Sequence, residues 1–414
     1  MLRLLRIPLH WQILAALILG ALAGVVLGES VLAVSFMGDL FLKALRMVIV
    51  PLILTSIICG VSGLGASGNM GSLGGKTFVY YTVSSLLAIL TGLVLVNLLQ
   101  PGVGVDLGLE KEPENLASSI ERFGSSPWQA LIRLVTDMVP TNPIASMADG
   151  NMLQVIVFAL LFGVFITRIP DDLRQPLETF FQGAFAVMMR ITHFVLAFAP
   201  LGIFALVART VAVTGLEVFS GLGLYFVTVL LGLLFHAGVT LPIVLSVVGR
   251  MRPVGHAQAM SPALLTAFST SSSSATLPLT MDSLERRGGV SNRVTSFVAP
   301  LGATVNMDGT ALYECVAAVF IAQAYGVELS YVQQFLVVVT ALLASIGAAG
   351  IPMAGLVMIS VILTAVGLPL EGVGLILAVD RVLDMCRTTV NVWSDSCGAA
   401  LVARFEGEAP HASR

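Results

Sequence analysis

Long apolar segments separated by short polar connections run through most of the chain. The first six segments are residues 11–27, 34–64, 77–99, a fourth region ending at 169, 179–207 and 216–248. Segments of this length suit the roughly 30 Å hydrocarbon core of a bilayer. The first apolar run continues into a full span and lacks a small-residue cleavage site, so we expect a transmembrane helix there and not a removed signal peptide.

Beyond these six segments the hydropathy becomes irregular. Residues 257–290 are apolar around a polar centre, S-T-S-S-S-S-A-T, and both flanks are basic. Residues 337–365 repeat this pattern around a glycine-rich centre without basic flanks. Non-helical backbone at membrane depth occurs only where protein or water contacts it. The pair of interrupted segments predicts two re-entrant hairpins of an inverted-repeat transporter; a plain helix with a polar seam is the alternative for the first.

A third interruption lies between the two hairpins, in the span 296–324. Its centre reads G-A-T-V-N-M-D-G-T and contains Gly302, Asn306 and Asp308, which are poor helix formers. We interpret it as an unwound helix. Free carbonyls beside a carboxylate are hard oxygen ligands that suit an alkali cation; a flexible kink is the alternative.

The last apolar segment carries a polar stripe, D-R-V-L-D-M-C-R-T-T-V-N-V-W-S-D over residues 380–395. Five of its side chains follow the spacing i, i+3, i+4, i+7 and i+11, which is one face of a helix: Asp384, Arg387, Thr388, Asn391 and Asp395. Charge is costly inside a bilayer, so such groups normally face partners, ions or substrate. The alternative is a structural ion-pair helix.

Composition agrees with a membrane protein and excludes some partners. Hydrophobic residues make up 57% and charged residues 11% of the 414 residues, with a mean hydropathy of +0.95; a soluble protein needs a more charged surface. The 21 Lys and Arg form no cluster, which argues against nucleic-acid binding. The four cysteines have no metal-ligand spacing and are expected to be reduced. Basic residues in alternate loops predict that both termini are cytoplasmic, in a cell (inner) membrane.

Four motifs together resemble the sodium-coupled glutamate/aspartate transporter family, which includes excitatory amino-acid transporters and bacterial glutamate symporters. They are S-S-S-S-A-T-L-P, N-M-D-G-T, A-S-I-G-A-A-G-I-P-M-A-G and D-M-C-R-T-T-V-N-V. The resemblance implies an all-α polytopic fold with about eight transmembrane helices, two re-entrant hairpins and inverted repeats. It also implies a homotrimer in which a transport domain moves against a scaffold as an elevator.

The domain organisation expected from this resemblance covers the whole chain. Its parts are scaffold helices 1–2 in residues 1–75, transport helix 3 with an acidic extracellular loop in 76–125, scaffold helices 4–5 in 126–210, transport helix 6 in 211–252, hairpin 1 in 253–290, broken helix 7 in 291–326, hairpin 2 in 327–369, polar helix 8 in 370–405 and a cytoplasmic tail in 406–414.

The resemblance also implies an acidic amino-acid substrate and the residues that bind it. These are Ser271, Ser272, Ser273, Thr310, Ile351, Pro352, Ala354, Gly355, Asp384, Arg387, Thr388 and Asn391. The planar fork of Arg387 fits a side-chain carboxylate, and Asp384 suits an ammonium group. Neutral amino-acid members of the family lack this arginine and C4-dicarboxylate members lack this acid; both remain alternative substrate classes.

Three sodium sites are implied in the same way, and no organic cofactor. The first would use Gly302, Asn306, Asn391 and Asp395; the second Thr304, Ser345, Ile346 and Ala348; the third Tyr81, Ser84, Ser85, Asn306 and Asp308. Taken alone, the polar residues near position 81 are equally typical of helix–helix hydrogen bonding.

The chain departs from the family pattern at several positions. Relatives place a second arginine at the position of Ser271 or Met385, and neither is arginine here. Trp393 and Ser394 also replace smaller or different residues. These substitutions have no explanation in the sequence.

Glu314 lies four residues after Thr310, within the same span. A lone buried glutamate favours its protonated form and suits a proton carrier. The resembling animal transporters have glutamate there and couple to protons with potassium counter-transport, so the resemblance extends both expectations to this chain. A structural glutamic acid is the alternative.

Two other function classes were weighed. An ion channel lacks a visible filter sequence. An intramembrane hydrolase using Ser273 and Asp384 lacks a histidine near these motifs and a G-x-S-x-G elbow. We therefore expect a transporter and not an enzyme.

Overall fold

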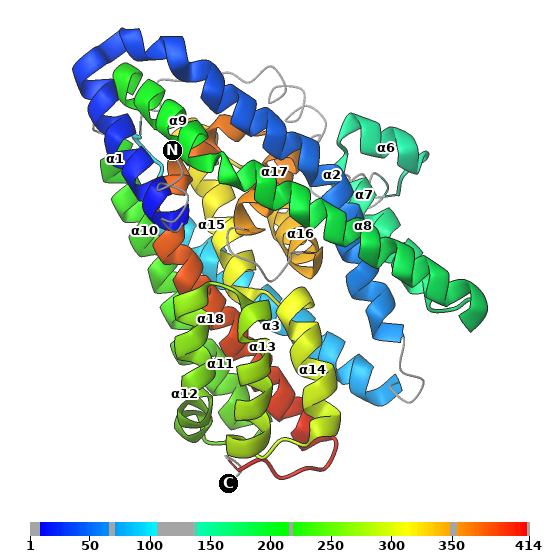
Figure 1. The fold of residues 1–414 in the computed structure, drawn as a ribbon. Helices are drawn as coiled ribbons and strands as arrows, with labels where there is room; N and C mark the ends of the chain where they lie inside the picture. Colours follow the sequence, from blue (N-terminus) through cyan, green and yellow to red (C-terminus); the bar gives the residue numbers. More distant parts are fainter. Residues whose placement is uncertain are drawn as a thin grey trace.

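The fold is helical throughout the part of the chain that the structure describes. The computed structural model describes residues 9–65, 71–105, 136, 139–214, 218–347 and 354–411, and all of the regular elements in these ranges are helices (Figure 1). Among them, four helical stretches are long and apolar enough to cross a membrane: Ile18–Phe41, Ser72–Leu99, Leu222–Val248 and Asn292–Ala324. The prediction of an all-α polytopic membrane protein is confirmed at this level.

One group of helices packs around α2. Its members are α1 (Leu9–Leu27), the 3₁₀ segment η2 (Gly28–Val34), α2 (Ser35–Gly65), α6 (Pro143–Asp149), α7 (Met152–Ile166), α8 (Asp171–Ala197) and α9 (Ala199–Thr214). The helix α2 contacts α7, α8 and α9, and α1 lies along α9. Small residues permit this close approach: a Cβ atom at Gly20 would lie 2.8 Å from the carbonyl oxygen of Phe204.

The predicted span over residues 179–207 is divided in the structure by a one-residue interruption at Phe198, between α8 and α9. Hydrogen bonds from Phe198 N to Val195 O and from Gly202 N to Phe198 O continue across it. Hydropathy could not locate this interruption, because the residues on both sides of it are apolar.

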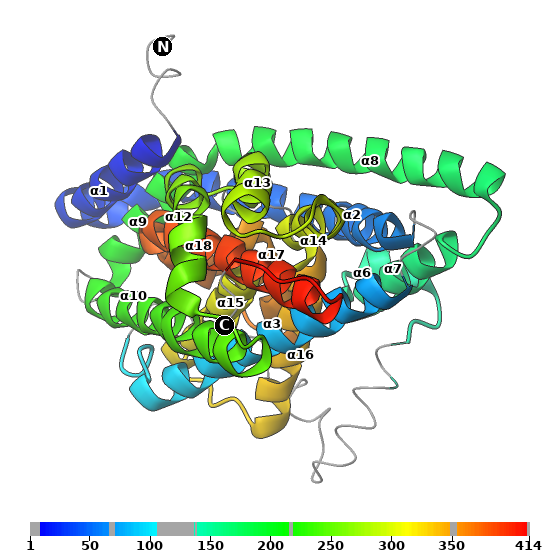
Figure 2. The same cartoon turned by 90° about the horizontal axis from the view of Figure 1, so that it is seen from below.

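A second group of helices packs around α18 (Val373–Phe405). The neighbours of α18 in this group are α3 (Gly71–Leu99), α10 (Val218–Phe235), α12 (Pro253–Thr270), α14 (Asn292–Val305) and α15 (Asp308–Ala324) (Figures 1 and 2). This group also contains the π-helical turn η3 (His236–Thr240), α11 (Leu241–Ile243) and the π-helical turn η4 (Val244–Val248). The polar stripe of the sequence is therefore in a helix with neighbours on several sides.

Two helical hairpins occur where the interrupted apolar segments predicted them. In the first, α12 (Pro253–Thr270) packs against α13 (Ser273–Asp282), which continues as the π-helical turn η5 (Ser283–Arg287). In the second, α16 (Tyr331–Gly347) packs against α17 (Ala354–Val366), and the 3₁₀ segment η6 (Leu370–Gly372) leads to α18. The tip of this second hairpin, residues 348–353, lies outside the described residues.

The predicted broken helix is present, with a shorter break than expected. The helix α14 (Asn292–Val305) ends just before Asn306, and α15 (Asp308–Ala324) begins after Met307. Gly302 lies within α14, and Asp308 is the first residue of α15. The break therefore leaves Asn306 and Met307 outside the helices. The polar side chains of Asn306 and Asp308 lie at its two edges.

The end of α18 is fastened to the beginnings of two other helices by Glu406. Its carboxylate accepts a hydrogen bond from Lys76 Nζ at 2.7 Å and forms an ion pair with Arg293 Nη2 at 3.1 Å. The hydrogen bond from Lys76 is the main cause that lowers the pKa of Glu406 below its ordinary value. Glu408 adds hydrogen bonds to the backbone and hydroxyl of Ser291.

We expect Glu406→Gln to lower the unfolding midpoint of the purified protein at neutral pH. A carboxylate with a lowered pKa stabilises the folded state above its unfolded pKa of about 4.3, and this contribution is lost as the pH falls through the folded value. The difference in Tm between the wild type and the variant should therefore shrink in acid. Glu328→Gln, which changes an exposed glutamate between α15 and α16, is the control. A difference in Tm that does not depend on pH would contradict the assignment.

Candidate functional site

The polar stripe of α18 is buried inside the protein. Its five predicted members, Asp384, Arg387, Thr388, Asn391 and Asp395, are at most 5% exposed, as are Asp380 and Ser394. The prediction of one shared, buried helix face is confirmed.

Arg387 is the most enclosed charge of this face, with 1% of its surface exposed. Its Nε donates to Oδ1 of Asp384 at 2.9 Å and its Nη1 to Oδ1 of Asp380 at 3.0 Å. The guanidinium also lies over the ring of Tyr313, 4.3 Å from the centroid, and Tyr313 Oη donates to Asp380 at 2.7 Å. Two carboxylates and an aromatic face thus hold the arginine in one orientation.

Arg381 is the second cation at this site. Its Nη1 lies 3.6 Å from Oδ2 of Asp384, whereas Arg387 contacts the other carboxylate oxygen, Oδ1. Sequence reasoning selected neither Arg381 nor Asp380 as site residues. Asp380 stands seven residues before Arg387, on the same helix face, so the spacing did carry a signal for it.

The second hairpin reaches this arginine through Gly355, near the start of α17. A Cβ atom on Gly355 would lie only 2.7 Å from Nη1 of Arg387, so the glycine backbone lies directly against the guanidinium. Ala354 opens the same helix. The predicted residues Ile351 and Pro352 lie outside the described residues.

The first hairpin presents its three predicted serines at the turn between its helices. Ser271 has a left-handed backbone, with φ of 51°, and its buried Oγ has no hydrogen-bond partner in the described part of the chain. The Ser272 side chain caps α13 by accepting from Ala275 N at 3.2 Å. Ser273 begins α13 and is buried. The left-handed residue allows the abrupt turn, as at many helix ends.

Asn391 ties α18 to the first turn of α15. Its Oδ1 accepts from the backbone N–H groups of Gly309 at 2.8 Å and Thr310 at 3.3 Å, and its Nδ2 donates to Thr310 Oγ1 at 3.0 Å. The Asn391 side chain is therefore directed toward Thr310.

Of the first predicted sodium set, the structure brings together three members. Asn306 Nδ2 donates to Asp395 Oδ1 at 2.9 Å. A Cβ atom at Gly302 would lie 2.5 Å from the same carboxylate oxygen, so Gly302 contacts Asp395 closely.

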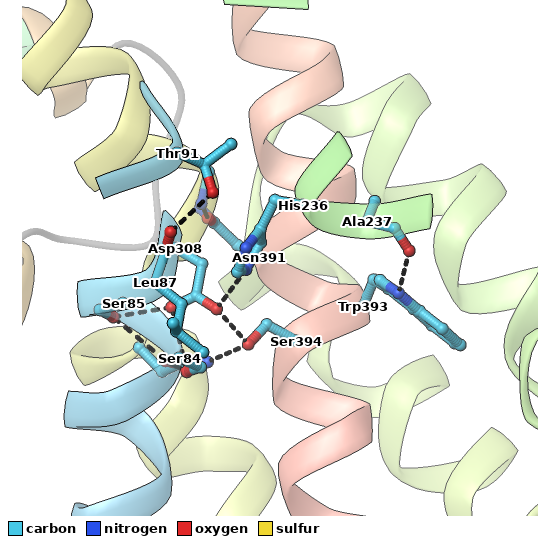
Figure 3. Close-up of polar contacts among 12 residues, drawn as sticks. Ser84, Ser85, Leu87, Thr91, His236, Ala237, Asp308, Asn391, Trp393 and Ser394 are labelled. Atoms are coloured by element: carbon cyan, nitrogen blue, oxygen red, sulfur yellow. Dashed lines mark hydrogen bonds and ion pairs between the residues drawn. The ribbon is translucent and has the colours of Figure 1, made fainter. Parts of the chain in front are cut away.

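Four members of the third predicted sodium set form a compact cluster of oxygen atoms, of which Figure 3 labels Ser84, Ser85 and Asp308; the fourth is Asn306. Oδ1 of Asp308 accepts from Ser85 Oγ at 2.7 Å and from Ser84 Oγ at 3.2 Å, and Asn306 Oδ1 lies 3.3 and 3.5 Å from Ser84 and Ser85. The hydroxyl of Tyr81 instead donates to the Val298 carbonyl at 2.7 Å, and the Tyr81 carbonyl oxygen lies 3.3 Å from Ser84 Oγ. Carboxylate, amide and hydroxyl oxygens are ligands that suit a hard cation.

The second predicted sodium set is described only in part. Thr304 is exposed, and its hydroxyl donates to the Leu301 carbonyl of its own helix at 3.0 Å. Ser345 is buried, with Oγ donating to Leu342 O at 2.8 Å. Ile346 lies in α16, and Ala348 lies outside the described residues.

Glu314 lies in α15, fully buried, and neither of its carboxyl oxygens has a hydrogen-bond partner in the described part of the chain. Burying a bare carboxylate costs more free energy than burying the neutral acid. The environment of Glu314 therefore suits a side chain that carries a proton.

The oxygen cluster has two further partners that sequence reasoning did not select as site residues. Oδ2 of Asp308 lies 2.6 Å from Ser394 Oγ, which donates to it, and 3.0 Å from His236 Nε2 (Figure 3). Ser394 is on the polar face of α18, one residue before Asp395. His236 comes from another helix, and its sequence surroundings are uniformly apolar.

Comparison with known proteins gives matches over nearly the whole chain. The chain is 36% identical over 412 residues to the proton/glutamate-aspartate symporter of Escherichia coli (strain K12), covering 97% of this chain and 94% of the relative. It is 34% identical over 407 residues to the proton/sodium-glutamate symport protein of Bacillus caldotenax, covering 97% and 96%. It is 39% identical over 449 residues to excitatory amino acid transporter 3 of Mus musculus, covering 96% and 86%.

The family model described as "Sodium:dicarboxylate symporter family" matches residues 9–405. That range contains both hairpins, the broken helix and all of α18. It agrees with the resemblance seen in the four sequence motifs. The chain is a multi-pass membrane transporter, not an enzyme, and belongs to the sodium:dicarboxylate symporter family.

Proposed function

We propose that this chain is a secondary active symporter that imports L-glutamate and L-aspartate together with sodium ions. The observation that carries the proposal is the buried pair of Arg387 and Asp384 on α18, 2.9 Å apart between Nε and Oδ1. The side-chain carboxylate of a substrate can take the place of Asp384 beside Arg387. Its ammonium group can take the place of Arg387 beside Asp384. The relatives named as glutamate and aspartate symporters support the same substrate class.

The second cation at Asp384 supports this assignment. Arg381 supplies positive charge near Asp384, which relatives obtain from an arginine at the position of Ser271 or Met385. In our proposal Arg381 balances the negative charge of Asp384 at Oδ2. The guanidinium of Arg387 can then bind the substrate carboxylate. A bidentate arginine–carboxylate pair is among the strongest hydrogen-bonded pairs in proteins.

The remaining substrate contacts are proposed on the hairpins and on α15. Ser271 to Ser273, Thr310, Gly355 and the residues around it would surround the α-carboxylate and the amine. The buried hydroxyl of Ser271 has no hydrogen-bond partner among the described residues, and this supports the placement, since a buried donor without a partner is costly unless a ligand uses it.

Transport itself is proposed to occur by an elevator motion within a homotrimer. The packing of helices into one group around α2 and another around α18 supports a division into scaffold and transport domains. The distribution of Lys and Arg supports cytoplasmic termini in the inner membrane.

Purified protein in liposomes should accumulate glutamate or aspartate when an inward sodium gradient is imposed. Uptake driven by a pH gradient alone, without sodium, would overturn the sodium assignment. Competition by neutral amino acids or C4-dicarboxylates, measured with and without sodium, tests the two alternative substrate classes.

Arg387→Lys should reduce the kcat/KM of glutamate uptake by about 10- to 100-fold. Lysine keeps the charge and removes the planar fork, at a cost of about 1.5–3 kcal/mol for a hydrogen bond to a charged group. The control is Arg404→Lys, at the far end of the same helix. An unaltered kcat/KM in Arg387→Lys would contradict a direct role for the fork.

We further propose that Glu314 carries a proton with the substrate, with potassium counter-transport as an additional step. Glu314→Gln should retain exchange of internal for external substrate and lose the pH dependence of that exchange. Glu328→Gln, an exposed change, should keep the wild-type pH profile. A Glu314→Gln profile identical to the wild type would refute proton coupling at this residue.

A further inference from the structure

Ser394 and Trp393 are neighbours on α18, and both side chains form hydrogen bonds to other helices of the group around α18. Ser394 is fully buried and Trp393 is 6% exposed. Ser394 contacts Asp308 and Asn306 of the oxygen cluster, and Trp393 contacts Ala237, the residue after His236 (Figure 3).

The Ser394 hydroxyl has a single hydrogen, and its geometry shows where that hydrogen goes. Ser394 Oγ lies 2.6 Å from Oδ2 of Asp308, a distance typical of a strong hydrogen bond to a carboxylate. An ionised carboxylate only accepts, so the hydroxyl must donate to it. Toward its other neighbours Ser394 can then only accept.

This restriction fixes the amide of Asn306. Asn306 Nδ2 lies 3.1 Å from Ser394 Oγ and 2.9 Å from Asp395 Oδ1, and both of these oxygens accept. If the amide were reversed, its oxygen would face two acceptors. The carbonyl oxygen of Asn306 is therefore turned the other way, toward Ser84 and Ser85.

The same hydroxyl fixes the carboxylate of Asp308. Oδ2 is occupied by Ser394 and by His236, whose Nε2 lies 3.0 Å away, so Oδ1 is the oxygen that faces Ser84 and Ser85. A cavity of about 10 Å³ adjoins Ser85 and is lined by Phe78, Tyr81, Thr82, Val305 and Leu342. That is about the space of one water-sized particle, on the Ser85 side of the cluster.

Trp393 holds the second partner of Asp308 in place. Its Nε1 donates to the carbonyl of Ala237 at 3.1 Å, and Ala237 follows His236 in the π-helical turn η3. π-Helical turns inside α-helices often occur at functional sites. Two consecutive residues of α18 thus act on Asp308 Oδ2. Ser394 donates to this oxygen directly, and Trp393 supports its other partner, His236, through the backbone of η3.

We propose that Ser394 is a positioning residue for a cation site formed by Asp308 Oδ1, Asn306 Oδ1, Ser84 Oγ and Ser85 Oγ, with Trp393 and His236 as its support. This inference rests on the proposed sodium coupling and adds a residue that acts through the ligands without contacting the ion. Partners of metal ligands typically contribute about 10- to 100-fold to affinity. We expect the lower end, about 10-fold, because Asp395 also holds Asn306.

The test is sodium binding to purified protein without substrate, read as the rise of Tm with NaCl concentration at constant ionic strength set by choline chloride. Ser394→Ala should need about 10-fold more sodium for half of the stabilisation. Ser396→Ala is the matched control: Ser396 is fully buried on the same helix, and its Oγ hydrogen-bonds Trp393 O and His256, away from Asp308. It should keep the wild-type sodium dependence.

Two further measurements separate positioning from general damage. Glutamate affinity at saturating sodium should be the same in Ser394→Ala and in the wild type, which a misfolded site would not achieve. Ser394→Cys, nearly isosteric with a weak S–H donor, should reproduce the sodium shift even where the alanine variant fails to fold. Ser394→Thr, which keeps the hydroxyl, should restore the wild-type response.

The outcomes distinguish this inference from the function on which it rests. A wild-type protein whose Tm does not respond to sodium overturns the proposed sodium coupling, and the inference with it. A wild type that responds, together with unshifted sodium dependence in both Ser394→Ala and Ser394→Cys, overturns the role of Ser394 alone.

Discussion

A charge placed inside a membrane protein needs an opposite charge or hydrogen-bonding partners, because hydrocarbon cannot solvate it. Arg387 meets this requirement with Asp380 and Asp384, and Asp384 is in turn matched by Arg381. These pairs fix the position of α18 relative to α15 through Tyr313. The surrounding helices and the second hairpin are arranged to enclose this network, so the fold and the site depend on the same electrostatic condition.

Much of this arrangement could be predicted from the sequence, because local patterns encode it. The spacing of Asp384, Arg387 and Asn391 determines one helix face whatever the neighbours are. The serine run and the residues around Asn306 interrupt apolar segments that would otherwise be continuous. These signals identified the first hairpin and the broken helix with Asn306 and Asp308. The grouping of these two residues with Ser84 and Ser85 was implied by the resemblance to the transporter family.

The features that the sequence did not predict depend on contacts between distant segments. His236 lies in an apolar stretch, and it meets Asp308 only because α10 and η3 pack beside α15 and α18. The interruption at Phe198 differs, because a local signal, Pro200, follows it by two residues, and hydropathy does not register a proline. The direction of the Asn391 side chain, toward Thr310, follows from the position of the first turn of α15.

Gly302 and Gly355 share a feature with consequences for sequence variation among relatives. Each lies in a helix, at a point where a methyl group would collide with a charged side chain, Asp395 in one case and Arg387 in the other. At both positions the absence of a Cβ atom leaves room for that charged group, and this close approach, not backbone flexibility, is what the glycine provides. Alanine would favour both helices, but its methyl group would displace the end of the charged side chain. A substitution there would have to be accompanied by a displaced carboxylate or a displaced arginine, which couples the evolution of the hairpin and of α14 to that of α18.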